Sequence, residues 1–164
     1  MVTHDQEEAL TMADRIILMN NGVIEQEGSP QDLYSKPKTA FSANFIGTTN
    51  LFKAKKISES SIEINGSALE CNENIKDDLL TVTIRPEDIK ISENGNEKNI
   101  LNGTIKELEF LGSNIRGHIE VDFESEKTND ICNFASEYIL NNNIKNNSSV
   151  RISLQPHALK VVNE

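Results

Sequence analysis

The chain has 164 residues, enough for one ordinary domain or for a small domain with a further segment, and its composition is that of a globular protein. Its formal net charge of -10 disfavours a nucleic-acid surface or an anionic membrane face, and the tight basic group Lys53, Lys55 and Lys56 is explained as a solvated strand end. No apolar run approaches the roughly 20 residues that span a bilayer, and the first residues lack the apolar core of a secretory signal. We therefore expect a cytoplasmic chain without direct membrane insertion.

The first part of the chain is predicted to alternate helix and strand. Asp5, with Glu8 three residues later, indicates a capping box at a helix start. Pro37 should end a later helix, and Gly47 can close another in a left-handed conformation. The predicted elements are a helix from Gln6 to about Ala13, strands Arg15–Met19 and Val23–Gln26 joined by the turn 20–22, a helix opened by Ser29 and Pro30, and a helix from Thr39 to Ile46 with Phe41 and Phe45 on one face.

Beyond Asn50 the apolar pattern has the period of two that is typical of half-buried strands. This change of pattern divides the chain into residues 1–48 and 49–164. Many short strands in the second part favour a small barrel or a sandwich, so the fold class is mostly β. The predicted strands are Leu51–Ile57, Ser61–Ile64, Leu80–Ile84, Ile89–Ser92, Gly103–Phe110, Ile115–Asp122, Ile131–Ala135, Val150–Leu154 and Leu159–Val162, with turns that include Glu124–Asp130 and Asn141–Ser149.

Two segments, Thr83–Ile89 and Ser153–Leu159, share a layout of strand, proline, two further residues and strand, which is compatible with two related half-units. The two cysteines, Cys71 and Cys132, have neither the spacing nor the histidine neighbours of a metal or redox site. We expect them to be buried free thiols.

Several residues that could carry chemistry have simpler interpretations. The segment Gly112–Ile119 has the glycine spacing of a phosphate loop, but His118 and Ile119 replace its lysine and hydroxyl, so a turn between strands is predicted. His118 then lies on the polar strand face, and His157 lies in a turn. The acidic residues Glu7, Glu8, Glu25 and Glu27 could form acid/base pairs, although acidic groups in a first helical turn also complement the helix dipole.

His4 has a more suggestive setting, because it immediately precedes a predicted helix start, where backbone amides favour an anion. A neutral imidazole there could donate one hydrogen bond to a phosphate or to attacking water and accept another, although a lone histidine is more often structural or solvated than catalytic. Its place so near the first residue, with nothing upstream to complete an active site, suggests a piece of a longer enzyme.

The first 50 residues resemble the end of the ATP-binding subunit of an ABC-type importer. The residues that carry the resemblance are Val2–Leu10, Ala13–Ile16, Gly22–Ile24, Glu27–Pro30, Leu33, Tyr34, Pro37, Phe41 and Asn44–Gly47. In that family the residue at the position of His4 is the switch histidine, which contacts the γ-phosphate and helps to place the hydrolytic water. The rest of the chain, with Ile84–Ile89, is similar to the family's transport-associated OB (TOBE) domain. The resemblance thus implies an OB-fold-like small barrel preceded by an α/β tail of a P-loop ATPase domain.

The family's other ATPase motifs are missing from the sequence: the Walker A lysine, the glutamine loop, the Leu-Ser-Gly-Gly signature and the Walker B acidic pair. ATP and Mg²⁺ would then belong to a longer parent protein, and no cofactor or metal is expected in this chain. His4 would be catalytic in the parent only, so we expect the chain alone neither to bind nor to hydrolyse ATP.

The resemblance implies a regulatory and dimer-contact region, with Phe41–Gly47 as the connector between its two parts. Its partners would be a second copy and, through the parent, membrane permease subunits, which places the parent on the cytoplasmic face of the membrane. The junction Gly47–Phe52 is similar to the polyamine, ferric-ion and phosphonate branch, with spermidine/putrescine first and sugars as a lesser option. Two alternatives remain: a stand-alone OB-like barrel that senses a small ligand or joins proteins, and a complete enzyme of unrecognised type.

Overall fold

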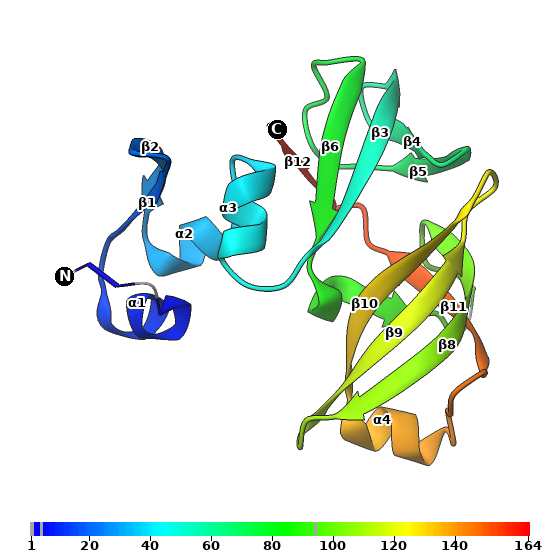
Figure 1. Ribbon diagram of the computed structural model, residues 1–164. Helices are drawn as coiled ribbons and strands as arrows, with labels where there is room; N and C mark the ends of the chain where they lie inside the picture. The colour runs from blue at the N-terminus through cyan, green and yellow to red at the C-terminus, as the bar shows by residue number, and fades with distance from the viewer. Residues whose placement is uncertain (1, 4, 94) are drawn as a thin grey trace.

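A computed structural model describes residues 2–3, 5–93 and 95–164. A small α/β segment lies on one side and a larger body of curled β-sheet on the other, joined through α3 (Figure 1). The α/β segment consists of α1 (Gln6–Met12), β1 (Ile16–Asn20), β2 (Val23–Gly28), α2 (Pro30–Ser35) and α3 (Ala40–Phe45). Every element predicted for this part is present, with bounds that differ by one or two residues.

Local sequence signals explain these elements. The Asp5 side chain accepts from the backbone N–H of Glu8 at 3.0 Å and caps α1. The reciprocal half of the predicted capping box is wrong, because the Glu8 carboxylate instead accepts from the Thr3 hydroxyl at 2.7 Å. Asn21 and Gly22 both have positive φ, as a two-residue hairpin turn requires.

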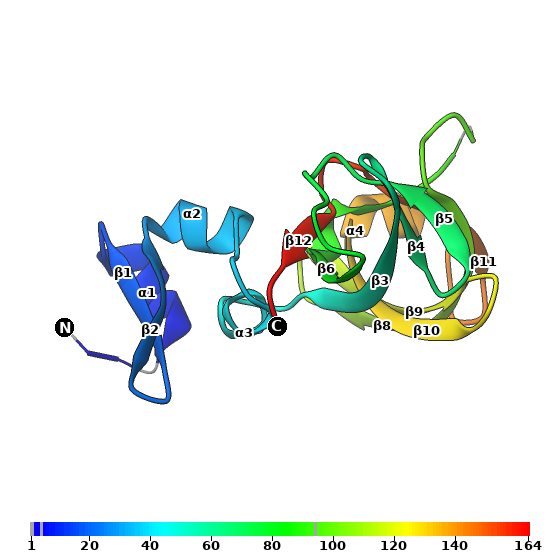
Figure 2. The ribbon, with the colours of Figure 1, turned by 90° about the horizontal axis from the view of Figure 1, so that it is seen from above.

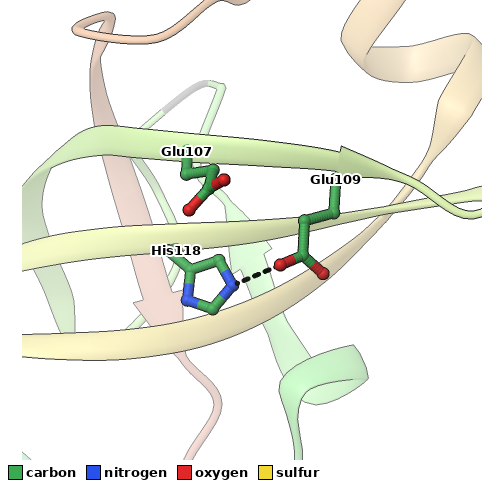
Figure 3. A group of neighbouring side chains, drawn as sticks. All are labelled: Glu107, Glu109 and His118. Carbon is green, nitrogen blue, oxygen red and sulfur yellow. Dashed lines mark hydrogen bonds and ion pairs between the residues drawn. The ribbon is translucent and has the colours of Figure 1, made fainter.

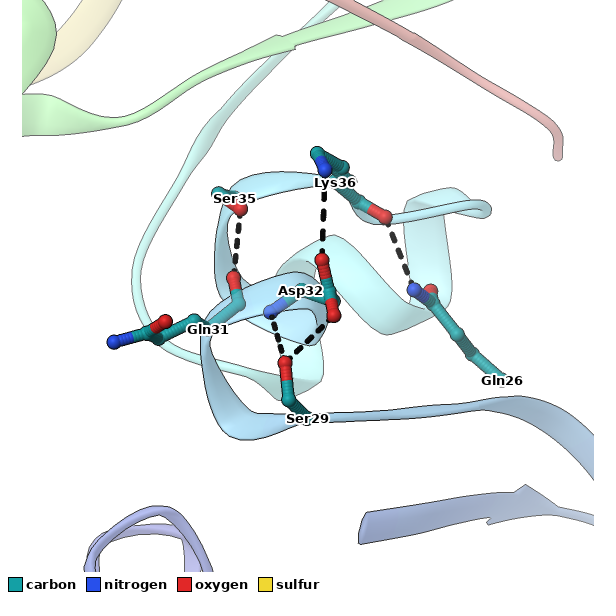
Figure 4. Close-up of polar contacts among 6 residues, drawn as sticks. All are labelled: Gln26, Ser29, Gln31, Asp32, Ser35 and Lys36. Carbon is teal, nitrogen blue, oxygen red and sulfur yellow. Dashed lines mark hydrogen bonds and ion pairs between the residues drawn. The ribbon is translucent and has the colours of Figure 1, made fainter. Parts of the chain in front are cut away.

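Helix α2 begins at a serine cap (Figure 4). The Ser29 hydroxyl accepts from the backbone N–H of Asp32 at 3.1 Å, and Pro30 occupies the first helical turn. The buried Gln26 amide fastens the end of the helix, since it donates to the Lys36 carbonyl at 3.0 Å and accepts from the Lys38 N–H at 2.8 Å. The side chain of Gln26 thereby supplies hydrogen-bond partners to backbone groups of this turn that have no strand beside them.

The body contains two five-stranded antiparallel sheets, ordered β10-β9-β8-β11-β7 and β12-β6-β3-β4-β5. Their strands are β3 (Asn50–Ser58), β4 (Ser61–Ile64), β5 (Ser67–Glu70), β6 (Leu79–Ile84), β7 (Ile89–Ile91), β8 (Ile100–Phe110), β9 (Asn114–Asp122), β10 (Lys127–Ala135), β11 (Ser149–Leu154) and β12 (Lys160–Val162). A short 3-10 helix, η1 (Pro86–Asp88), and helix α4 (Ser136–Asn141) complete the body. The fold is mostly β and OB-like, as the sequence predicts.

One continuous core fills the space between the two sheets. Ile62, Ile64, Ile105, Ile119 and Ile152 are each fully buried in it. They alternate with outward-facing polar residues along their strands, which is the pattern that predicts half-buried strands. A separate small cluster, in which Leu18, Leu33 and Ile46 are buried, holds the α/β segment together.

The two proline-containing segments lie side by side and cross between the sheets in opposite directions. Strands β6 and β7 flank Pro86, strands β11 and β12 flank Pro156, and the ladders pair β6 with β12 and β7 with β11. The similar layout that the sequence shows in these segments therefore has a counterpart in a locally two-fold arrangement. Both prolines are buried at the crossing.

Some predictions are wrong in detail. Strand β5 and helix α4 were not predicted, and β10 begins at Lys127, so the second half of the predicted turn Glu124–Asp130 is strand. The polar Lys127 and Asn129 occupy the outer face of β10, which hid its strand character from a hydrophobic pattern. The three apolar residues that begin β1, Ile16, Ile17 and Leu18, differ in exposure. Ile17 is 53% exposed, but Leu18 is only 4% exposed, because α2 and α3 cover that face.

Asparagine side chains close two sheet edges. The Asn50 amide donates to the Ile131 carbonyl and accepts from the Ile131 N–H, both at 2.8 Å, and so joins β3 to the outer strand β10 of the other sheet. Asn99 pairs in the same way with the N–H and carbonyl of Glu70 on the edge strand β5, both at 2.7 Å. Each amide satisfies backbone groups that an unpaired edge would leave open.

We expect Asn50→Ala to lower the free energy of unfolding by about 2 kcal/mol, because it leaves the N–H and the carbonyl of Ile131 without partners beside a buried position. Urea unfolding measures the change. Asn129→Ala, which alters an exposed asparagine on the same strand β10, is the matched control and should stay within about 0.5 kcal/mol of the wild type. Equal stabilities for the two variants would contradict the proposed edge closure.

Candidate functional site

The candidate catalytic residue His4 lies outside the described residues. Of the four glutamates considered as acid/base groups, Glu8 accepts a hydrogen bond from the Thr3 hydroxyl at 2.7 Å, and Glu27 pairs with Arg15 at 2.9 Å. The structure thus gives structural partners to two of the four glutamates that could have formed acid/base pairs.

The remaining candidates are dispersed over the body. Residues 111–113 form the turn between β8 and β9, as the sequence predicts for the segment that resembles a phosphate loop. His157 is exposed in the turn between β11 and β12, and both cysteines are free and buried, also as predicted. His118 lies on the polar outer face of β9, where its Nε2 lies 3.2 Å from Oε1 of Glu109.

Arg85 makes four hydrogen bonds from the body to the α/β segment. It follows β6 at the first proline crossing, and its side chain is 7% exposed. Nη1 donates to the carbonyls of Ala43 at 2.9 Å and Thr48 at 3.1 Å, with a longer bond to Gly47 at 3.3 Å. Nη2 donates to the Tyr34 carbonyl at 3.1 Å. The carbonyls of Tyr34 and Ala43 belong to the last turns of α2 and α3, where the helix dipole favours a cation.

Tyr34 completes this joint, which we call the Arg85 joint: Arg85, Tyr34, Glu87 and the carbonyls of Ala43, Gly47 and Thr48. The guanidinium carbon of Arg85 lies 4.2 Å from the centroid of the Tyr34 ring, and the Tyr34 hydroxyl donates to the Glu87 carboxylate. Burial and the bond to Glu87 raise the pKa of Tyr34 to about 12, so its hydroxyl stays protonated as a donor. Burial also lowers the pKa of Arg85, although an arginine remains charged at neutral pH.

Backbone contacts reinforce the joint. Gly47, at φ +86°, ends α3 in the left-handed conformation that the sequence predicts, and a Cβ there would lie 3.2 Å from the Tyr34 ring. Just beyond β12, the Asn163 carbonyl accepts from the Ala40 N–H at 2.7 Å, and its N–H donates to Lys38 at 2.8 Å. The C-terminus accordingly lies beside α3 (Figure 2). Arg85 at the end of β6 and Asn163 at the end of β12 therefore both bind the segment that contains α3.

A cleft of about 410 Å³ lies next to the joint, between the end of α2 and the two proline turns. Its walls carry both signs of charge, with Lys36, His157 and Lys160 near Glu87 and Asp88. Burial, followed by the neighbouring Glu87, raises the pKa of Asp88 above its ordinary value. With opposite charges this close, the cleft offers no surplus of one sign of charge to a strongly charged ligand.

The sequence singled out the segment around Arg85 through its proline layout and through a family resemblance, but it did not reveal what Arg85 does. An arginine directly before a proline, after a buried strand, was the available signal, because such a side chain must find its partners in another part of the chain. Those partners are backbone carbonyls, which no residue pattern could identify.

Comparisons with known proteins give consistent results. A family described as the TOBE domain matches residues 82–162, which include Arg85 and both proline turns. The spermidine/putrescine import ATP-binding protein PotA of Borreliella afzelii is 44% identical over 130 residues, which are 78% of this chain and 36% of that protein. PotA of Acetivibrio thermocellus is 44% identical over 113 residues, 68% of this chain and 32% of that protein. PotA of Salmonella typhimurium is 39% identical over 131 residues, which are 74% of this chain and 35% of that protein. The chain therefore spans about a third of the length of the relatives it matches.

Among solved structures, the cytoplasmic molybdate-binding protein ModG, with molybdate bound, is similar with a TM-score of 0.54 over 70% of this chain and 96% of that chain. Its sequence identity is 14%, so the likeness concerns the fold alone. No helix in the described part of the chain is long and apolar enough to cross a membrane.

Proposed function

Residues 82–162 belong to the TOBE domain family, and from this premise we propose that the chain is the C-terminal part of the ATP-binding subunit of an ABC importer, in which the TOBE domain is fastened to the end of the ATPase domain. The division at 48/49 is part of this proposal. The relatives' names, and their identity of 39–44% over most of this chain, support it.

The Arg85 joint is the observation that carries the proposal. Arg85 lies inside the region that matches the TOBE family, whereas Tyr34, Ala43 and Thr48 lie before it. A buried cation that binds carbonyls of three different turns can hold two bodies in a fixed relation. We propose a regulatory role on this basis: the joint passes changes of orientation between the ATPase domain and the TOBE domain, and Phe41–Gly47 is the connector.

ATP hydrolysis belongs, in this proposal, to the longer protein. His4 would there act as the switch histidine near the γ-phosphate, with ATP and Mg²⁺ held by motifs that the present sequence lacks. The chain alone is proposed to have no ATPase activity. Its proposed partners are a second copy and the permease subunits, which would hold the longer protein at the cytoplasmic face of the membrane.

Polyamines are the proposed solutes, because the relatives are named for spermidine/putrescine import. Disruption of the chromosomal gene that encodes this chain should reduce uptake of radiolabelled spermidine or putrescine at least tenfold and leave uptake of ferric ion, phosphonates and sugars unchanged. Loss of one of these other solutes with normal polyamine uptake would overturn the assignment of the solute.

A point variant in the same gene tests the role of the joint. Arg85→Ala should reduce polyamine uptake several-fold after normalisation to the amount of the protein in the cell, whereas Arg15→Ala, which removes an exposed arginine paired with Glu27, should not. Normal uptake in the Arg85 variant would exclude the joint from transport while leaving the family membership intact.

A further inference from the structure

Three potential metal ligands gather on the outer face of the sheet formed by β8 and β9 (Figure 3). Glu107 and Glu109 extend from β8 and His118 extends from β9, and one ligand atom from each lies within 4.8 Å of the other two. Nε2 of His118 lies 3.2 Å from Oε1 of Glu109. We call these three residues the outer cluster.

A β-bulge produces this arrangement. Ile105 pairs with Ile119, but the next pair is Glu107 with His118, so Lys106 is the additional residue. Without the bulge, Glu107 would alternate to the inner face of the sheet. With it, both glutamates share the face of His118, and two paired strands hold them in place.

The surrounding charges leave the cluster with unused negative charge. Arg116 contacts Oε2 of Glu109 at 3.5 Å, whereas Oε1 faces the histidine. The adjacent Lys106 and Lys127 both contact Glu120, at 3.1 and 3.2 Å. Within the described part of the chain, no ion pair compensates Glu107. The outer cluster therefore combines a free carboxylate, a carboxylate oriented by an arginine, and an imidazole nitrogen.

We propose that the outer cluster is a binding site for a divalent transition-metal ion of the zinc type. One imidazole and two carboxylates supply three protein ligands, and water can take the fourth position of a tetrahedral Zn²⁺. Mg²⁺ and Ca²⁺ fit this cluster less well, because they require about six oxygen ligands. The bound ion would connect β8 to β9 across the bulge, and Arg116 would orient Glu109 as an outer partner of a ligating carboxylate.

Calorimetric titration of the purified chain with Zn²⁺ alone tests the site. The wild type should bind one ion saturably, and Glu107→Gln and His118→Ala should each weaken binding at least tenfold. His4→Ala and His157→Ala alter the two other histidines of the sequence and, with Glu126→Gln on an exposed turn, should leave affinity within twofold. Circular dichroism without metal should give the same melting temperature for the wild type and for the variants of Glu107, His118, Glu126 and His157, because these four side chains are at least partly exposed.

A second readout locates the ion. The imidazole ¹⁵N resonances of His118 should shift on addition of Zn²⁺, whereas those of His157 should not, and millimolar Mg²⁺ should not displace the ion. Three results would each overturn the proposal. The wild type could fail to bind Zn²⁺ saturably, both cluster variants could keep the wild-type affinity, or a control histidine variant could lose binding.

Discussion

Arg85→Ala should lower the free energy of unfolding by about 3 kcal/mol, because it leaves four carbonyl acceptors without their donor and removes the cation above the Tyr34 ring. This loss of stability is partly offset, because the folded variant no longer buries a charge. Arg85→Lys should cost nearly as much, because an ammonium cannot reach carbonyls of three turns in the fixed geometry of a guanidinium. Urea unfolding of the purified chain measures both changes.

Limited proteolysis distinguishes undocking from general loosening. In the Arg85 variants, cleavage by trypsin after Lys38 should accelerate tenfold or more, because the α/β segment is released from the body. Cleavage after lysines in the sheets, such as Lys55, should change much less. Arg15→Ala is the control and should match the wild type in both assays, since its ion pair is exposed. Wild-type stability and protection in Arg85→Lys would contradict the joint.

The sequence was sufficient for most of the fold because local signals and burial agreed. Ser29 with Pro30, the Asn21-Gly22 turn and the alternating pattern of β9 each depend on residues that are close in the chain, and the structure has them as predicted. Helix α4 was not predicted from the sequence because it has only six residues and no side-chain cap. Strand β5 could have been inferred, since the Asn65-Gly66 turn after β4 requires a partner strand.

The long-range polar contacts could not be read from the chain. Asn50 finds Ile131 across 81 positions, and Arg85 finds Tyr34 across 51 positions, through backbone atoms that every residue carries. The outer cluster depends on a bulge at Lys106, and a one-residue shift in pairing is invisible in a hydrophobic pattern. Strict alternation of inward and outward residues places His118 correctly on the polar face of β9. The same alternation places Glu107 on the inner face of β8, because it does not allow for the bulge.

Asp130 provides the second large expected effect. Its side chain faces the interior from β10 and is 6% exposed. Burial raises its pKa from 3.8 to about 6, against the opposing bond from the Thr128 hydroxyl, which donates to the carboxylate at 2.5 Å. Because the folded state binds this proton more tightly than the unfolded state, the group favours folding below about pH 4, and this contribution is lost as the pH rises to about 6 and above.

Asp130→Asn should therefore stabilise the chain at pH 7.5. One pKa unit corresponds to about 1.4 kcal/mol, so the shift from 3.8 to about 6 predicts a gain of about 3 kcal/mol, provided that the amide still accepts the Thr128 bond. The difference in unfolding free energy between variant and wild type should grow from pH 4 to pH 6 and then stay constant above pH 7. Urea unfolding at half-unit pH intervals measures this difference.

The difference between the two proteins isolates Asp130 from the other carboxylates. Asp32 and Glu120 have pKa values lowered by hydrogen bonds to their neighbours, so they make the wild type more stable as the pH rises, which is the opposite direction. These contributions cancel in the comparison, because both proteins contain them. Asp77→Asn, at an exposed position, should give a difference from the wild type of less than about 0.5 kcal/mol at every pH. A pH-independent difference for Asp130→Asn would mean that burial does not penalise the charged carboxylate, and the variant's stability would then report side-chain packing alone.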